Sequence, residues 1–284
     1  MNTAVRAAEP FTLRRARPLL GTLVEVGVGV RVGVNVGTGN AAIAAEGAIE
    51  AAFAAVRRVH TALTRFAADS DIGRFNAASA GAVLDVGPDA QAVLRASAQL
   101  QAWSAGAFDI TLGSGPTDWH LRGARLEKRS AAVRIDLGGI AKGHAVDAAV
   151  QALQAAGCAA GWVNAGGDLR CFGSSGLTLQ LRDEMGGGVR PWGRLQDGAC
   201  ATSHYAPGSR SALVQSGPAA RRLVQSGPSE QRLLHLSVLA PCCLWADALT
   251  KVAAQYLPDP ADRLDRPGWQ HPALRSLRAV AVWH

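Results

Sequence analysis

The sequence has little of what marks several large classes of protein. Aromatic residues make up only 5% of its 284 residues, and its 29 Lys and Arg are scattered along the chain. The net charge of +7 gives a mild preference for anionic partners. Without a basic stripe or interleaved aromatic residues, we expect no nucleic-acid binding. Charged residues amount to 18% and hydrophobic residues to 48%, which is typical of a globular chain and not of a disordered one.

Cysteine is scarce, and its spacing fits neither a zinc site nor a disulfide framework. The count of five is odd and no C-x-x-C pair occurs, which favours buried, reduced thiols. No window reaches ~18 uninterrupted apolar residues, so we expect no transmembrane segment. Residues 1–20 lack the apolar centre of a signal peptide, and we interpret residues 1–17 as a flexible leader. We therefore predict a cytoplasmic location, with a periplasmic or membrane-associated one as the alternative.

Hydrophobic periodicity predicts a mixture of strands and helices. Residues 22–36 alternate with period two, which predicts a long strand or a hairpin with one buried face. Its apolar face carries Val24, Val26, Val28, Val30, Val32, Val34 and Val36. Helical spacing predicts helices over 41–66, 88–104, 145–156 and 244–256. Shorter runs predict strands at 107–112, 132–136, 177–182, 234–239 and 277–282, and residues 162–173 predict two strands joined by a tight turn at Gly166 and Gly167. The mixture indicates an α/β or mixed α+β fold, which we assign to one domain over residues 1–284.

A tandem duplication lies between two of the predicted strands. The sequence LVQSGP at 213–218 recurs at 223–228, with a period of ten residues. Two copies are too few for a solenoid. We interpret residues 205–232 as an exposed, flexible loop.

A glycine-rich stretch at 136–143 joins a predicted strand to a predicted helix. Glycine lets the backbone approach a ligand closely, and the first turn of a helix offers N–H groups to phosphate. Asp136 is suited to a hydroxyl, a ring N–H or a metal, and Lys142 to a phosphate. The spacing matches neither a P-loop nor G-x-G-x-x-G. A plain strand-loop-helix connection is the alternative interpretation.

Seven short motifs together resemble the ApbE family, the FAD:protein FMN transferases. In chain order they are Leu20–Thr22, Ser70–Asn76, Phe108–Thr111, Asp136–Gly143, Val163–Asp168, Ala201–Ser203 and Ala246–Thr250. The resemblance implies an ApbE-like fold, with mixed sheets flanked by helices. It implies transfer of FMN from FAD to a Thr or Ser hydroxyl, with release of AMP and dependence on Mg²⁺. The implied acceptor is a flavoprotein subunit of a redox complex.

The resemblance also implies roles for individual residues. Asp247 is the expected metal carboxylate and a catalytic residue, with Thr250 and the Gly139 carbonyl as further metal ligands. Lys142 is the second expected catalytic residue and also contacts FAD. The other expected FAD contacts are Leu20, Phe108, Asp109, Asp136, Gly166 and Gly167. Taken one at a time, these residues have structural alternatives, since Asp247 suits a helix N-terminus and Asp109 and Asp168 suit turns.

The sequence departs from the family at two places. Lys251 stands four residues after Asp247, where many members have a Ser or Thr hydroxyl, and a protonated lysine is no metal ligand. Two interpretations stay open: Lys251 is a fixed cation beside the phosphates, or the metal site is weaker than in other members. The family's His-x-x-Asp-Pro-x-Thr-Gly segment is missing, and the duplicated segment stands in its place. No general base is assigned. Two alternatives therefore stay open: an FAD-binding protein impaired in transfer, and an FAD pyrophosphatase that forms FMN and AMP.

Overall fold

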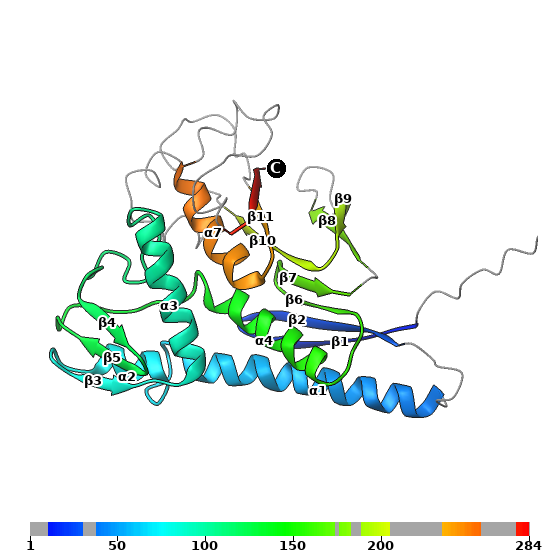
Figure 1. Cartoon of the computed structure of the whole chain (residues 1–284), viewed down its shortest axis with the longest axis horizontal. Coiled ribbons are helices and arrows are strands. Elements are labelled where there is room, and N and C mark those ends of the chain that lie inside the picture. Colours follow the sequence, from blue (N-terminus) through cyan, green and yellow to red (C-terminus); the bar gives the residue numbers. More distant parts are fainter. Residues whose placement is uncertain are drawn as a thin grey trace, which may run out of the picture.

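A seven-stranded antiparallel sheet forms the centre of the computed structural model (Figure 1). The structure describes residues 11–30, 38–173, 176–182, 189–204, 235–256 and 277–283. In sheet order the strands are β1 (Phe11–Leu19), β2 (Thr22–Val30), β6 (Gly161–Ala165), β7 (Asp168–Phe172), β10 (Gly198–His204), β11 (His235–Ala240) and β12 (Val280–Trp283). Every neighbouring pair in this sheet is antiparallel.

Three helices lie along this sheet, and the other elements stand at its sides (Figure 1). The three are α1 (Thr38–Leu63), α4 (Ala141–Ala155) and α7 (Cys243–Tyr256). The other helices are α2 (Asp71–Ala77) and α3 (Pro88–Trp103). The other strands form a sheet of β3 (Val83–Asp85), β5 (Arg125–Lys128) and β4 (Trp119–Arg122) and a hairpin of β8 (Leu177–Arg182) and β9 (Val189–Leu195). The predicted mixed α+β class is confirmed.

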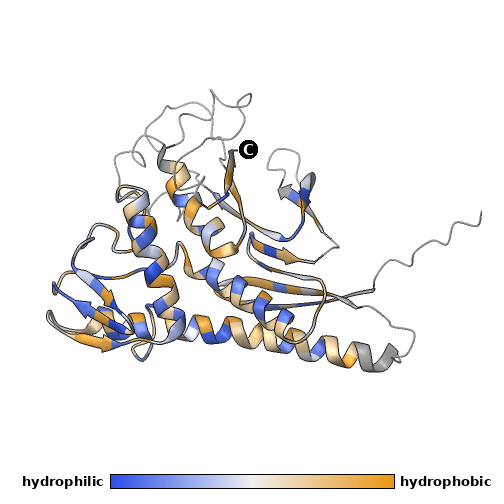
Figure 2. Ribbon diagram, in the orientation of Figure 1, coloured by the Kyte–Doolittle hydropathy of each residue, from blue (hydrophilic) through white to orange (hydrophobic). Residues whose placement is uncertain are grey.

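The valine face of β2 is buried as its alternation predicts. Val24, Val26 and Val28 lie in the core, whereas Leu23 on the other face is exposed. Residues 31–36 of the predicted strand lie outside the described residues. The helices bear both hydrophobic and hydrophilic residues along their length (Figure 2). Their buried faces join the sheet in one hydrophobic cluster, and many of the helical residues in it are alanines, which allow close packing.

The predicted flexible leader is wrong for residues 11–17, because they lie in β1. The arginines of this segment have carboxylate partners in the fold. Arg14 pairs with a glutamate on β2, and Arg15 and Arg17 pair with Glu46 and Glu50 on α1. Residues 1–10 and the duplicated loop at 205–232 lie outside the described residues.

Two of the predicted strands are wrong. In both segments, side chains make the hydrogen bonds to the backbone that a neighbouring strand would otherwise make. Residues 107–112 form turns, and the Asp109 carboxylate accepts hydrogen bonds from the N–H groups of Thr111 and Gly113, both at 2.8 Å. Residues 132–136 form no strand. There the Asn76 amide pairs with the backbone of Ile135, accepting from its N–H at 2.7 Å and donating to its carbonyl at 2.9 Å.

The other predicted elements are found within a few residues of their expected bounds. The helices at 41–66, 88–104 and 244–256 correspond to α1, α3 and α7, and the strands at 162–173, 177–182, 234–239 and 277–282 to β6 with β7, β8, β11 and β12. Helix α4 begins at Ala141, four residues before the predicted start at 145, so Lys142 belongs to its first turn. None of the helices in the described ranges combines the length and hydropathy that a membrane crossing requires.

Candidate active site

Two tight hairpin turns meet at one end of the central sheet. The turn between β1 and β2 consists of Leu20 and Gly21, with φ angles of 56° and 70°. The turn between β6 and β7 consists of Gly166 and Gly167, with φ angles of 62° and 102°. Positive φ at both central residues is the geometry of a two-residue hairpin, and leucine adopts it at a cost. The pairing of β2 with β6 brings the turns together, so that a Cβ on Gly166 would lie 2.4 Å from the Thr22 Oγ1.

The N-termini of α4 and α7 pack against each other beside these turns. A Cβ on Gly143 in α4 would lie 2.2 Å from the Cys243 carbonyl oxygen, so only glycine fits this contact. The buried carboxylate of Asp147 accepts hydrogen bonds from the N–H groups of Cys243 and Leu244, at 2.9 and 2.8 Å, and from Arg170 at 2.7 Å. Asp147 thus caps α7 from a neighbouring helix. These contacts set Lys142 of α4 beside α7.

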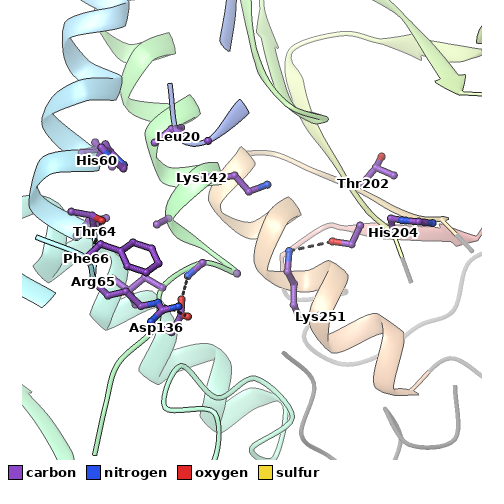
Figure 3. Close-up of a pocket in the computed structure, with 18 residues that line it drawn as sticks. Leu20, His60, Thr64, Arg65, Phe66, Asp136, Lys142, Thr202, His204 and Lys251 are labelled. Atoms are coloured by element: carbon purple, nitrogen blue, oxygen red, sulfur yellow. Dashed lines mark hydrogen bonds and ion pairs between the residues drawn. The ribbon is translucent and has the colours of Figure 1, made fainter. Parts of the chain in front are cut away.

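A pocket of about 510 Å³ opens at this junction. Its described lining comes from the β1–β2 turn, the end of α1, the loop after α1, the glycine-rich stretch and start of α4, β10 and α7 (Figure 3). It consists of Leu20, Gly21, Val59, His60, Leu63, Thr64, Arg65, Phe66, Asp136, Leu137, Gly138, Gly139, Ala141, Lys142, Thr202, Ser203, His204 and Lys251. Arg65, Phe66 and Asp136 stand on one side of it, and Thr202, His204 and Lys251 on the other (Figure 3).

Two ammonium groups on the pocket wall are each paired with a carboxylate buried behind it. The Lys142 Nζ lies 2.5 Å from the Asp168 Oδ2, and the Lys251 Nζ lies 2.6 Å from the Asp247 Oδ1. Burial and the neighbouring Asp247 carboxylate raise the pKa of Asp168 to about 6, against the opposing effect of Lys142. Burial also raises the pKa of Asp247, but Lys251 and Lys142 outweigh it, and its pKa lies below the ordinary value. Burial lowers the pKa of Lys142, yet Asp168 and Asp247 together raise it above the ordinary value.

The groups around Asp247 do not fit the expected Mg²⁺ site as they stand. The ammonium group of Lys251 holds the Oδ1 of Asp247, and the Gly143 N–H donates to its Oδ2 at 3.2 Å. The Thr250 hydroxyl donates to the Asp247 carbonyl and hydrogen-bonds to the Ser203 hydroxyl, both at 2.7 Å. A divalent ion on Asp247 would have to displace or adjoin the ammonium group, and like charges repel. Within the described ranges, no three His, Cys, Asp or Glu side chains form a metal-binding group elsewhere.

An ion pair and an exposed aromatic ring form the opposite wall. The Arg65 Nε lies 3.0 Å from the Asp136 Oδ2, and the Gly138 N–H donates to the Asp136 Oδ1 at 2.8 Å. The Arg65 guanidinium also lies over the Phe66 ring, 4.3 Å from its centroid. Phe66 is 76% exposed although it lines the pocket, so its ring offers a surface for a planar group.

The structure brings only part of the predicted site residues to the pocket wall. Leu20, Asp136, Gly139 and Lys142 line it. Asp247 and Thr250 are fully buried behind Lys251 and Ser203. The remaining four predicted contacts, Phe108, Asp109, Gly166 and Gly167, are absent from the described lining. Asp109 forms a turn, as its structural alternative predicts, and its loop holds Asp136 through the Ile110 carbonyl, which accepts the Asp136 N–H at 2.8 Å.

Sequence reasoning missed Arg65 and Phe66 and the placement of Ser203 and Lys251. The first two follow the last turn of α1, where a basic residue is ordinary at a helix end and gives no signal. Lys251 departs from the family pattern four residues after Asp247, and this spacing alone predicts that the two side chains meet. Asp168 was interpreted as a turn former in the absence of a family match, whereas its buried carboxylate pairs with Lys142.

Comparisons with known proteins show what this chain is similar to. A model of the ApbE family matches residues 20–127 and 114–264. Flavin transferase ApbE from Vibrio cholerae shares 17% identity, over 97% of this chain and 94% of that chain, with a TM-score of 0.70. The apo flavinyl transferase ApbE of Pseudomonas stutzeri shares 22% identity, over 86% and 84%, with a TM-score of 0.66. The ApbE protein of Thermotoga maritima shares 19% identity, over 89% of each chain, with a TM-score of 0.66. No curated protein matches.

Proposed function

Because this chain belongs to the ApbE family, we propose that it transfers FMN from FAD to a Ser or Thr hydroxyl of a flavoprotein and releases AMP. The observation that carries this proposal is a pocket with two ammonium groups at its base and an exposed aromatic ring on its wall. The base is suited to the pyrophosphate of FAD, and the wall to one of its planar rings.

Two ammonium groups and the backbone at the start of α4 support the proposed binding of the pyrophosphate. Lys142 and Lys251 each place an ammonium group on the pocket. The first turn of α4 and the Gly138–Gly139 pair also line it, and helix N-termini favour phosphate through their N–H groups and dipole. The chain contains only three lysines, against 26 arginines, and two of the three line this pocket.

Side chains on the opposite wall of the pocket support the proposed binding of the flavin or adenine ring. The ring of Phe66 and the apolar side chain of Leu20 offer surfaces on which the flavin or adenine would pack. Asp136 would accept a hydrogen bond from a ring N–H or a ribose hydroxyl, and Arg65 fixes the orientation of its carboxylate.

In the proposed reaction the acceptor hydroxyl attacks the phosphorus of the FMN phosphate. The bond from this phosphorus to the bridging oxygen breaks, and AMP departs with that oxygen. Negative charge grows on the departing phosphate, so fixed cations nearby lower the barrier. His60 and His204 are the histidines of the described lining and therefore the candidates for the group that accepts the hydroxyl proton.

The predicted magnesium dependence is not carried into this proposal. Bound Mg²⁺ would supply Lewis-acid neutralisation of the pyrophosphate through Asp247, Thr250 and the Gly139 carbonyl. The contacts of Lys251 with Asp247 argue against that ligand set, and the proposed reaction does not depend on the ion. The proposed acceptor remains a flavoprotein subunit of a redox complex, and the cytoplasmic location remains a prediction.

Intact-mass analysis tests the proposal. The protein is incubated with FAD and an acceptor domain that carries a Ser/Thr-Gly-Ala-Thr/Ser site, with and without Mg²⁺. We expect the acceptor to gain the mass of FMN and AMP to appear in equal amount. Asp247→Asn should strongly reduce the gain, because the Asp247 carboxylate holds the Lys251 ammonium group on the pocket, whereas Asp85→Asn, the same change at an exposed residue of β3, should not. Release of FMN and AMP without an acceptor would instead indicate a pyrophosphatase, and bound but intact FAD an impaired flavin-binding protein.

A further inference from the structure

We propose that the ammonium group of Lys251 takes the place of a divalent metal ion in this pocket and binds the pyrophosphate of the substrate directly. The inference rests on the proposed function only for the identity of the substrate. It makes a separate statement about the site, namely that the cation beside Asp247 belongs to the protein itself.

The surroundings of the Lys251 ammonium group resemble those of a bound cation. Its Nζ lies 2.6 Å from the Asp247 Oδ1, 3.1 Å from the Asp247 carbonyl oxygen and 3.2 Å from the Ser203 Oγ. These are a carboxylate, a carbonyl and a hydroxyl oxygen, the hard donors that Mg²⁺ also prefers. The distances are those of hydrogen bonds, longer than the ~2.1 Å of a magnesium–oxygen bond.

Local sequence holds the ammonium group in this place. Lys251 follows Asp247 by one turn of α7, the spacing at which two side chains meet on a helix surface. The lysine stem runs past Gly139, where a Cβ would lie 3.4 Å from the Lys251 Cε. The Lys251 side chain is only 14% exposed, yet it reaches the pocket wall. It therefore faces the buried carboxylate and the substrate space at once.

The charges of the site leave little attraction for a further divalent ion. Among the described residues, two buried carboxylates, Asp168 and Asp247, are each paired with an ammonium group, that of Lys142 and that of Lys251. An ion within bonding distance of the Asp247 Oδ1 would lie within about 5 Å of the Lys251 Nζ, close enough for strong repulsion in a buried site. Replacing Lys251 by a neutral residue leaves one carboxylate unmatched and so creates the charge that a metal ion requires.

Lysine is also an unusual choice in this chain, which supports a specific role. Arginine outnumbers lysine by 26 to three. The third lysine, Lys128, is fully buried and donates to the carbonyls of Phe75 and Asn76. Lysine carries a compact, point-like charge, whereas the planar guanidinium of arginine is too broad to occupy the place of an ion.

Manganese binding and FAD binding, measured without turnover, test this inference. The variants are Lys251→Thr and Lys251→Met, with Arg122→Thr as a control that removes a positive charge from the exposed end of β4. Free Mn²⁺ is followed by electron paramagnetic resonance, FAD affinity by flavin fluorescence with EDTA or with Mg²⁺, and folding by circular dichroism. Using two variants guards against one that fails to fold.

For the wild type and Arg122→Thr, we expect no Mn²⁺ binding and an FAD affinity that EDTA leaves unchanged. Both Lys251 variants should bind FAD about ten- to a hundredfold more weakly in EDTA, the loss of one charged hydrogen bond. Lys251→Thr, which provides a hydroxyl, should bind Mn²⁺ and recover part of the FAD affinity in Mg²⁺.

Tight Mn²⁺ binding by the wild type, or an FAD affinity that collapses in EDTA, would overturn the inference. Failure of every form to bind FAD would overturn both the pyrophosphate contact and the proposed function. Metal-independent FAD binding without FMN transfer would support this inference while refuting the proposed function, so the two failures are distinguishable.

Discussion

The contact between α4 and α7 makes a sharp prediction for Gly143→Ala. The new Cβ would lie 2.2 Å from the Cys243 carbonyl oxygen, 2.6 Å from the Cys243 carbonyl carbon and 2.9 Å from the Leu244 Cα. All three are backbone atoms, so no side chain can rotate away, and the helices must separate. Overpacking of this kind costs about 1–3 kcal/mol, and we take the upper end because backbone must move.

A smaller effect opposes this cost. Alanine is favoured over glycine inside a helix by up to about 1 kcal/mol. The net loss in the free energy of unfolding is therefore about 2 kcal/mol. For a chain of this size that corresponds to a fall in Tm of about 4–8 °C. The 3.2 Å hydrogen bond from the Gly143 N–H to Asp247 should lengthen as well, so FAD affinity should fall with stability.

Urea unfolding and calorimetry measure the stability change, and flavin fluorescence measures the change in affinity. Gly47→Ala is the matched control, because Gly47 lies in α1 and nothing stands within 4 Å of its new Cβ. The control should gain up to about 1 kcal/mol. A Gly143→Ala protein with the stability and FAD affinity of the wild type would refute the proposed packing of the two helices.

Three further predictions follow from the site. Asp147→Asn should lower the free energy of unfolding, measured in urea, by about 1.5–3 kcal/mol, because the start of α7 and Arg170 lose a charged acceptor. Asp85→Asn should leave it almost unchanged. Equal effects of the two substitutions would exclude the capping role. The pKa of Asp168, about 6, lies above its unfolded value near 3.9, so its contribution to stability is full below pH 4 and is lost as pH rises to about 6. The stability of Asp168→Asn relative to the wild type should therefore rise as the pH goes from 4 to 6. A difference in Tm that stays constant across calorimetric scans in this range would contradict the raised pKa. Phe66→Ala should weaken FAD binding by about tenfold and leave Tm unchanged, since the ring is 76% exposed; unchanged affinity would remove Phe66 from the ring site.

The sequence by itself determined the elements whose signals are local. Period-two alternation identified β2, and apolar spacing with Pro88 at its start identified α3. The paired glycines at 166–167 identified the turn between β6 and β7, since their positive φ angles are ones that few other residues adopt. The ordered motifs also indicated the family, because they depend on residue identity at fixed spacing.

The tertiary structure decided what each charged residue does. The early arginines fall in a segment interpreted from the sequence as a leader, but partners on α1 and β2 stabilise them in a strand. Asp109 and Asp168 had the same structural alternative in the sequence. One became a turn former, and the other a buried partner of Lys142, because only the packing of β7 against α4 brings that ammonium group within reach.

The same reason explains the site as a whole. The spacing of Asp247 and Lys251 is local, and the sequence alone predicts their proximity. The surroundings of this pair come from β10, α4 and the glycine-rich stretch before α4, all of which lie far from α7 in the chain. Whether a carboxylate holds a metal ion, an ammonium group or a backbone N–H depends on which opposite charge lies nearest in a buried space, and folding alone sets that distance.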